Sequence, residues 1–264
     1  MTGHAHGRRR ALVVGIGAGG LDQVTVEAVR ALNAADVFLV TDKDGSGGAA
    51  GAGDLVRLRE AVIARHRTDP ERRIVRVADP PRNRAPRDDA EYAAAVRDWH
   101  AARARAWADA LTEALPDGGT AVVPVWGDPA LYDSAVRVLE QARGLGADLE
   151  YEVIPGVSSL TLLAARHRLV LNRIGGAVLV TTGRRLAADA AGGTDDLAVM
   201  LDGGLACADL PGEWEIHWGA NLGTDDEELV AGPLAEVLPA IRAARTRAKA
   251  ARGWVMDVYL LRRI

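Results

Sequence analysis

The sequence predicts an α/β fold with two α/β domains, the first of them built on a mostly parallel sheet. Two observations predict it. From Ala11 to Ile154, apolar runs typical of buried strands alternate with helix-forming stretches, which favours parallel strands covered by helices. After Asn172 the pattern changes to strand-like segments with one long helix-forming stretch. We therefore expect a first domain over residues 8–172 and a second over residues 173–264.

Composition indicates a soluble globular protein. Of the 264 residues, 48% are hydrophobic and 26% charged, and no apolar run approaches the length that spans a bilayer. The start, MTGHAHGRRR, lacks the apolar core of a signal peptide, so we expect a cytoplasmic protein. A net charge of −4 argues against a general nucleic-acid or membrane-surface binder. The single cysteine, Cys207, excludes an internal disulfide and a cysteine-rich metal site, and we expect no metal.

A strand over residues 11–16, a glycine-rich turn and a helix over residues 22–34 open the chain. The turn fits the pattern G-x-G-x-x-G with Gly15, Gly17 and Gly20. The next strand, residues 36–41, ends at Asp42, where dinucleotide-binding folds place the acid that binds a ribose. A nicotinamide-dependent oxidoreductase therefore stays open as an alternative, although many α/β proteins use such a turn for packing alone.

The middle of the first domain contains a basic loop. A glycine- and alanine-rich loop (45–53), a helix (54–66) and a short strand (73–77) come before it, and a long helix (88–115) follows. The arginines of the basic loop are Arg82, Arg84 and Arg87. Because guanidinium groups pair bidentately with carboxylates, these three could hold a polyanionic ligand. A solvated loop fits the same residues equally well.

Two strand-to-helix junctions carry the strongest local signal. The strand over residues 121–125 stops at Trp126-Gly127-Asp128-Pro129, and a helix is expected from about Ala130. The strand over residues 151–154 stops at Pro155-Gly156, and Ser158 or Ser159 is expected to cap the next helix. Open α/β folds bind ligands at the carboxyl ends of their strands. Both junctions are therefore predicted to form edges of one pocket.

In the second domain the predicted strands cover residues 175–182, 196–201, 213–218 and 254–261, and a helix is expected over residues 234–249.

Taken together, these motifs resemble those of the tetrapyrrole methylases, the S-adenosylmethionine-dependent methyltransferases of corrin and sirohaem synthesis. The resemblance covers nearly the whole chain. It is carried by GIGAGG with LDQVT, ALNAADVF, DKD, VWGDPALYDS, EVIPGVSS, LAARHRLVLNRIG, TTGRRL, VMLDGG, WGANLG and GWVMDVYLLRR. One difference concerns the first loop, where the family commonly has Gly-Asp-Pro and this chain has Gly19-Gly20-Leu21. That difference leaves a non-catalytic tetrapyrrole-binding protein as a further alternative.

The resemblance implies a homodimer whose S-adenosylmethionine lies in a cleft between the two domains. The glycine-rich first turn would then bind no nucleotide phosphate. Carried over residue by residue, the cofactor contacts fall on Trp126, Gly127, Asp128, Leu131, Ser158, Ser159, Leu201, Asp202, Ala220 and Gly223. Many of these contacts would be made by the backbone.

The implied reaction removes the acetyl group at C1 of precorrin-5 as acetate and methylates that carbon. Methyl transfer needs in-line alignment of the reactants. Deacetylation needs a water, a base and a donor to the developing oxyanion. Asp42 and Asp128 are the candidate bases, although Asp128 could simply cap a helix, and Tyr132 could orient the substrate. Arg184 and Arg185, which follow the TTG segment, join the three loop arginines as candidates for binding substrate carboxylates.

Overall fold

The computed structural model describes residues 8–42, 52–69, 71, 73–81, 87–253 and 255–264. Contacts divide the chain into two units. The first unit contains the residues up to Gly17 together with Leu21–Val157, and the second contains Ala18–Gly20 together with Ser158–Ile264. The helix that follows Pro155-Gly156 thus belongs to the second unit, whereas the predicted ranges, 8–172 and 173–264, placed it in the first.

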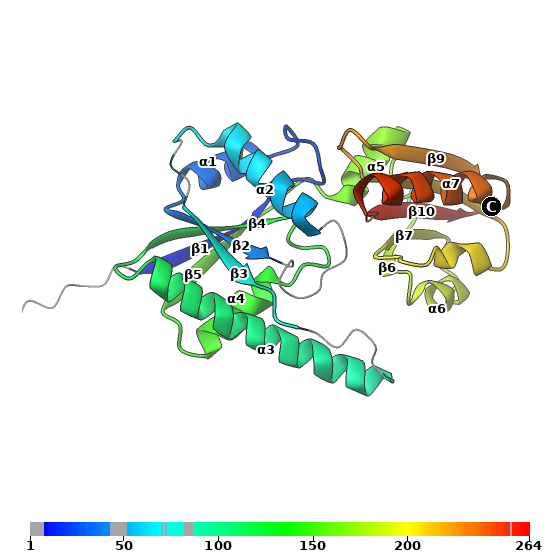
Figure 1. Ribbon diagram of the computed structural model, residues 1–264. Coiled ribbons are helices and arrows are strands. Elements are labelled where there is room, and N and C mark those ends of the chain that lie inside the picture. The colour runs from blue at the N-terminus through cyan, green and yellow to red at the C-terminus, as the bar shows by residue number, and fades with distance from the viewer. Residues whose placement is uncertain (1–7, 43–51, 70, 72, 82–86, 254) are drawn as a thin grey trace, which may run out of the picture. The chain divides into compact units, whose positions relative to one another are not determined.

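Five parallel strands form the sheet of the first unit, in the order β3-β2-β4-β1-β5 (Figure 1). They are β1 (Arg9–Gly15), β2 (Val37–Asp42), β3 (Ile74–Ala78), β4 (Gly119–Val125) and β5 (Leu149–Ile154). The central strands β1 and β4 have near-continuous apolar sequences and are buried along most of their length. Such runs are typical of parallel strands covered on both faces. The predicted mostly parallel sheet is confirmed.

Helices cover both faces of this sheet (Figure 1). They are α1 (Val26–Asn33), α2 (Ala52–His66), α3 (Asp89–Ala114) and α4 (Ala135–Gly144). Successive strand residues point to opposite faces. Phe38 and Val122 accordingly pack in the core under α1 and α2, whereas Leu39 and Val123 pack in the core under α3 and α4.

The predicted starts of two helices were wrong. Helix α1 begins at Val26 rather than near residue 22, because the Thr25 hydroxyl accepts the Ala28 N–H at 3.0 Å and caps the helix there. Helix α4 begins at Ala135 rather than near Ala130. The intervening residues form turns, in which the carboxylates of Asp128 and Asp133 accept backbone N–H groups two residues further along, at 2.7 and 2.6 Å.

A mixed sheet of five strands forms the second unit, in the order β6-β7-β10-β8-β9. Strands β6 and β7 are parallel and the other pairs antiparallel. The elements are α5 (Ser159–His167), β6 (Leu179–Thr182), α6 (Leu186–Ala191), β7 (Asp196–Met200), η2 (Ala206–Asp209), β8 (Trp214–Ala220), β9 (Glu228–Pro233), α7 (Leu234–Arg252) and β10 (Asp257–Arg263). The sequence predicted neither β9 nor α6, and the strand expected from residue 175 begins only at Leu179.

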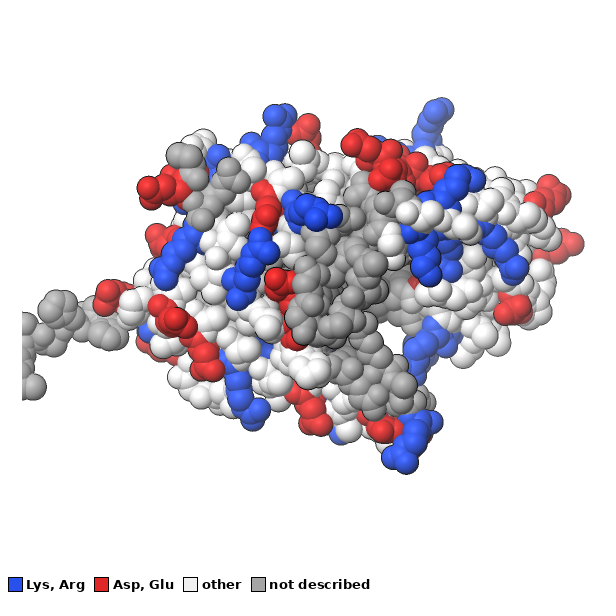
Figure 2. Space-filling view, in the orientation of Figure 1, with Lys and Arg blue, Asp and Glu red and all other residues white. Residues whose placement is uncertain are grey.

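Large aromatic side chains anchor the core of the second unit. Trp214, Trp218 and Tyr259 are at most 2% exposed. On the face shown in Figure 2, basic side chains lie among acidic ones over the described residues, as the small net charge leads one to expect. Within the described ranges, no helix combines the length and the apolar character needed to cross a membrane.

Candidate functional site

The loops that follow three neighbouring strands lie at one edge of the first sheet. In the parallel register, Val13 of β1 is paired with Val123 of β4 and with Val153 of β5. The segments after these strands therefore leave the sheet at the same end, which we call the carboxyl edge. Gly17 and Gly127 form a bridge there, with the Gly127 N–H donating to the Gly17 carbonyl oxygen at 2.8 Å. The carboxyl edge is thus built from both predicted junction loops and the glycine-rich turn.

Glycines allow these backbones to approach closely. A Cβ atom at Gly156 would lie 2.3 Å from the Gly127 carbonyl oxygen, and one at Gly15 would lie 2.6 Å from the Gly156 nitrogen. The glycines of the first turn thus serve packing between loops, and helix α1 starts only at Val26. This geometry lacks the direct turn-to-helix step that binds a pyrophosphate, so it does not favour the nicotinamide alternative.

The Asp128 carboxylate joins the two junction loops. Its Oδ1 accepts the Ala130 N–H at 2.7 Å, and its Oδ2 accepts the Gly156 N–H at 2.9 Å. Each oxygen therefore has a backbone donor, one within its own loop and one in the loop after β5. This arrangement favours a structural role for Asp128 over that of a general base, whose oxygen must be available to a water.

The other two candidate catalytic residues also lie at the carboxyl edge. Asp42 is the last residue of β2, with its side chain 25% exposed and its Oδ2 3.8 Å from the Arg76 guanidinium. Tyr132 is 47% exposed and has a φ of +53°, a left-handed backbone conformation that is uncommon for an aromatic residue. Such strain is found most often near functional sites.

The predicted cofactor positions of the first unit lie in one loop. Gly127 is buried, and Trp126 and Leu131 are half-buried on either side of the Asp128 turn. In the second unit, the Ser158 hydroxyl accepts the Thr161 N–H at 3.1 Å and caps α5, as predicted.

The remaining predicted positions follow strands β7 and β8. Leu201, directly after β7, is 67% exposed with a φ of +53°. Asp202 is 5% exposed, and its carboxylate accepts the N–H groups of Gly204 and Ala206 and the Tyr259 hydroxyl. Its side chain is therefore committed to the fold, which leaves the backbone to contact a ligand.

Ala220 and Gly223 complete the predicted set. Ala220 is the fully buried last residue of β8, and the Gly223 N–H donates to Glu227 Oε2 at 2.6 Å.

The structure describes three of the five candidate arginines. Arg82 and Arg84 lie outside the described residues. Arg87 pairs with Glu91 at 3.0 Å, Arg185 pairs with Asp189 at 3.1 Å, and Arg184 is exposed beside it. Ion pairs of this kind, between an exposed arginine and a carboxylate one helical turn away, contribute little to stability. They can be exchanged for a ligand carboxylate.

Sequence reasoning missed two arginines, Arg59 and Arg103, which line a cavity over the ends of β2 and β4. A signal was present, since Trp99, Arg103 and Trp107 recur at intervals of four residues and so share one helix face. The sequence could not reveal that Arg59, from another helix, meets them.

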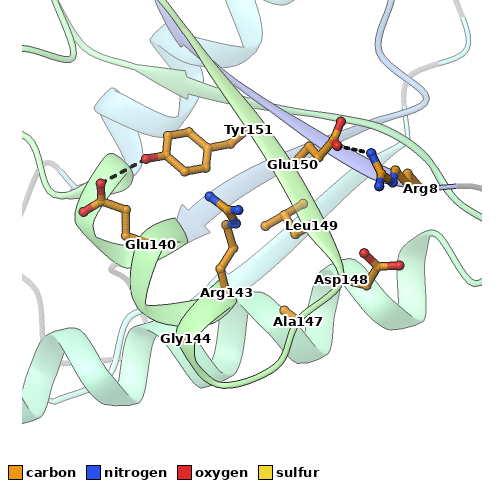
Figure 3. Close-up of a pocket in the computed structure, with 9 residues that line it drawn as sticks. All are labelled: Arg8, Glu140, Arg143, Gly144, Ala147, Asp148, Leu149, Glu150 and Tyr151. Carbon is orange, nitrogen blue, oxygen red and sulfur yellow. Dashed lines mark hydrogen bonds and ion pairs between the residues drawn. The ribbon is translucent and has the colours of Figure 1, made fainter.

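A separate hollow of about 570 Å³ lies at the opposite edge of the sheet, where β5 begins (Figure 3). Several of its polar side chains already have partners within the hollow. Arg8 contacts Glu150, and the Tyr151 hydroxyl donates to Glu140 at 3.0 Å. Ligand sites of open α/β sheets lie at the carboxyl ends of strands, so this hollow is not the candidate site.

Comparisons with known proteins agree with the family resemblance that the sequence motifs carry. The family model of the tetrapyrrole (corrin/porphyrin) methylases matches residues 11–238. A curated relative from Sinorhizobium, named precorrin-6A synthase (deacetylating), is 40% identical over 259 residues, which are 97% of this chain and 96% of the relative.

Solved structures share the fold. A cobalamin synthesis related protein from Corynebacterium diphtheriae is 34% identical, with a TM-score of 0.80 over 97% of this chain and 99% of that one. A uroporphyrin-III C-methyltransferase from Thermus thermophilus is 20% identical, with a TM-score of 0.60 over 97% of this chain and 93% of the other. The second likeness supports the fold alone.

Proposed function

The chain belongs to the tetrapyrrole (corrin/porphyrin) methylases, and on that basis we propose that this S-adenosylmethionine-dependent methyltransferase of cobalamin biosynthesis converts precorrin-5 to precorrin-6A. In this reaction precorrin-5, S-adenosylmethionine and water give precorrin-6A, acetate and S-adenosylhomocysteine. The observation that carries the proposal is 40% identity over 97% of the chain to a relative named for that synthase activity. The finer parts of the proposal are a cytoplasmic enzyme and a homodimer.

Features of each unit, taken separately, support S-adenosylmethionine as the cofactor. In the first unit the predicted positions lie in the loop after β4, which offers backbone groups. In the second unit they lie in the loops after β7 and β8 and at the start of α5, where the first N–H groups of a helix have no partner within it. Leu201 adds an exposed residue in a strained conformation, as ligand contacts often require. The cofactor would supply a methyl group on an electrophilic sulfonium.

The residues of the chain would contribute alignment and proton transfer. Fixed loops orient the reactants for in-line displacement, which can supply much of the rate enhancement. For deacetylation, we propose Asp42 as the base that activates water, because both Asp128 oxygens already accept backbone N–H groups. Tyr132, Arg87, Arg184 and Arg185, together with Arg82 and Arg84 outside the described residues, are proposed to orient the polycarboxylate substrate.

The reaction can be tested with S-adenosylmethionine labelled with ¹³C in its methyl group. Incubation of the protein with precorrin-5 is expected to give one labelled methyl group on C1 of the product and one acetate for each S-adenosylhomocysteine formed. Product NMR locates the methyl group, and an enzymatic assay measures acetate. Label on another ring carbon, or methyl transfer without acetate, would contradict the proposed reaction. A pigment that binds but receives no label would restore the non-catalytic alternative.

A further inference from the structure

A cavity of 180 Å³ lies in the first unit, at the carboxyl edge. Thr41 and Val125, from the ends of β2 and β4, line it together with residues 132–135 of the loop before α4. Two guanidinium groups also line it, those of Arg59 from α2 and Arg103 from α3. The cavity is smaller than the roughly 300–1,000 Å³ of sites that enclose a whole small molecule. It has room for one short side chain of a larger ligand.

Arg103 is held in place by aromatic and polar neighbours. Its guanidinium carbon lies 4.6 Å from the ring centroid of Trp99 and 5.6 Å from that of Trp107. Nη1 donates to the Ser134 hydroxyl at 2.8 Å, and Nε lies 3.3 Å from the Asp79 carboxylate. Since its side chain is only 11% exposed, this cation is fixed before any ligand arrives, which lowers the entropic cost of binding.

Arg59 supplies a second cation, whose positive charge is less well compensated by neighbouring negative groups. Within the described part of the chain, its guanidinium has neither a hydrogen-bond nor an ion-pair partner, although the charge of Asp133 acts on it. Burial lowers the pKa of Arg59, and the positive charge of Arg103 adds to that effect. Burial also lowers the pKa of Arg103. An anion placed near both groups would relieve this unfavourable electrostatic state.

A third donor in the cavity lining lacks an acceptor. Trp107 is 2% exposed, and its indole Nε1 has no hydrogen-bond partner among the described residues. Buried donors without a partner are uncommon and call for an explanation. A carboxylate has two acceptor oxygens, which suit two guanidinium groups and an indole N–H.

We propose that this cavity is a carboxylate subsite, formed by Arg59, Arg103 and Trp107, that receives one acidic side chain of the substrate. The inference rests on the proposed function, because precorrins carry several carboxylates on short alkyl stems. It adds two arginines to the set that the sequence suggested. It also places part of the substrate beside Thr41, next to Asp42.

Sodium propionate is the probe for this subsite. In the full-length protein labelled with ¹⁵N at tryptophan, the indole N–H resonance of Trp107, identified with Trp107→Phe, is expected to shift saturably as propionate is added. Propionamide, which has the same shape without the charge, is expected to cause no shift. Arg59→Gln should weaken propionate binding by about ten-fold or more, the usual effect of losing one charge-assisted hydrogen bond. Arg57→Gln, an exposed arginine on the same helix, is the matched control.

Two results of the titration would overturn the subsite. One is the absence of a saturable Trp107 shift in the wild-type protein, and the other is an equal propionate affinity in Arg59→Gln and Arg57→Gln. In turnover, Arg59→Gln should raise KM for precorrin-5 without changing the affinity for S-adenosylhomocysteine. A protein that binds propionate in this way but never methylates precorrin-5 would disprove the proposed function and leave the subsite intact. Normal turnover with an unchanged KM for precorrin-5 in Arg59→Gln would disprove the subsite and leave the proposed function intact.

Discussion

Gly156→Ala is expected to lower the free energy of unfolding by at least about 3 kcal/mol, the upper range for forcing an extra methyl group into a packed site. The new Cβ would lie 2.3 Å from the Gly127 carbonyl oxygen. That carbonyl cannot move independently, because Gly127 is bridged to Gly17. The junction loops would separate, and the affinity for S-adenosylhomocysteine should fall with the urea midpoint.

Gly144→Ala is the matched control. Gly144 is the last residue of α4, and a Cβ there would meet no heavy atom within 4 Å apart from its chain neighbours and the backbone of its own helix. Alanine is favoured over glycine in helices by roughly 0.5–1 kcal/mol, so this variant should unfold at the same or a slightly higher urea concentration. If both variants had the wild-type midpoint, the close approach of the two junction loops would be refuted.

Asp42→Asn is expected to reduce the rate of acetate release by about 100-fold or more, the usual contribution of a general base. Its affinity for S-adenosylhomocysteine should be unchanged, because Asp42, whose carboxylate lies 3.8 Å from the Arg76 guanidinium, is not among the predicted cofactor contacts. Asparagine has nearly the same shape as aspartate but cannot accept the proton of a water. Acetate release under saturating S-adenosylmethionine is the measurement.

Asp128→Asn is the comparison for that experiment. Asparagine can keep only one of the two backbone hydrogen bonds that Asp128 accepts from Ala130 and Gly156. The Asp128 variant should therefore lose stability and cofactor affinity together with activity. If Asp128→Asn kept its stability and its cofactor affinity and lost only acetate release, while Asp42→Asn stayed fully active, Asp128 rather than Asp42 would be the base.

Local signals in the sequence predicted most of the first unit and the start of the first helix of the second unit. The buried runs of β1 and β4 identified a parallel sheet, and Ser158 identified the start of α5 through its capping hydroxyl. The start of α4 was misplaced because Pro129 suggested a first helical residue. In the structure, the Asp128 carboxylate holds a turn there and Tyr132 adopts a left-handed conformation, which ends any continuous helix.

Contacts between distant segments could not be predicted. Whether Asp128 would cap a helix or join the loop after β5 depends on a hydrogen bond to Gly156, 28 residues away in the chain. The convergence of Arg59 and Arg103 likewise depends on how α2 and α3 meet the sheet. Strand β9 alternates half-buried and exposed residues at the edge of its sheet and gave no apolar run to detect.

Calorimetric titration of the protein with S-adenosylhomocysteine, and in parallel with NADH and NADPH, tests most directly the claim that this is an S-adenosylmethionine-dependent enzyme. We expect micromolar binding of S-adenosylhomocysteine and no heat from either nicotinamide. Gly144→Ala should bind as the wild type does, and Gly156→Ala much more weakly. Binding of a reduced nicotinamide, without any binding of S-adenosylhomocysteine, would contradict S-adenosylmethionine dependence and indicate that the glycine-rich turn and Asp42 form a dinucleotide site.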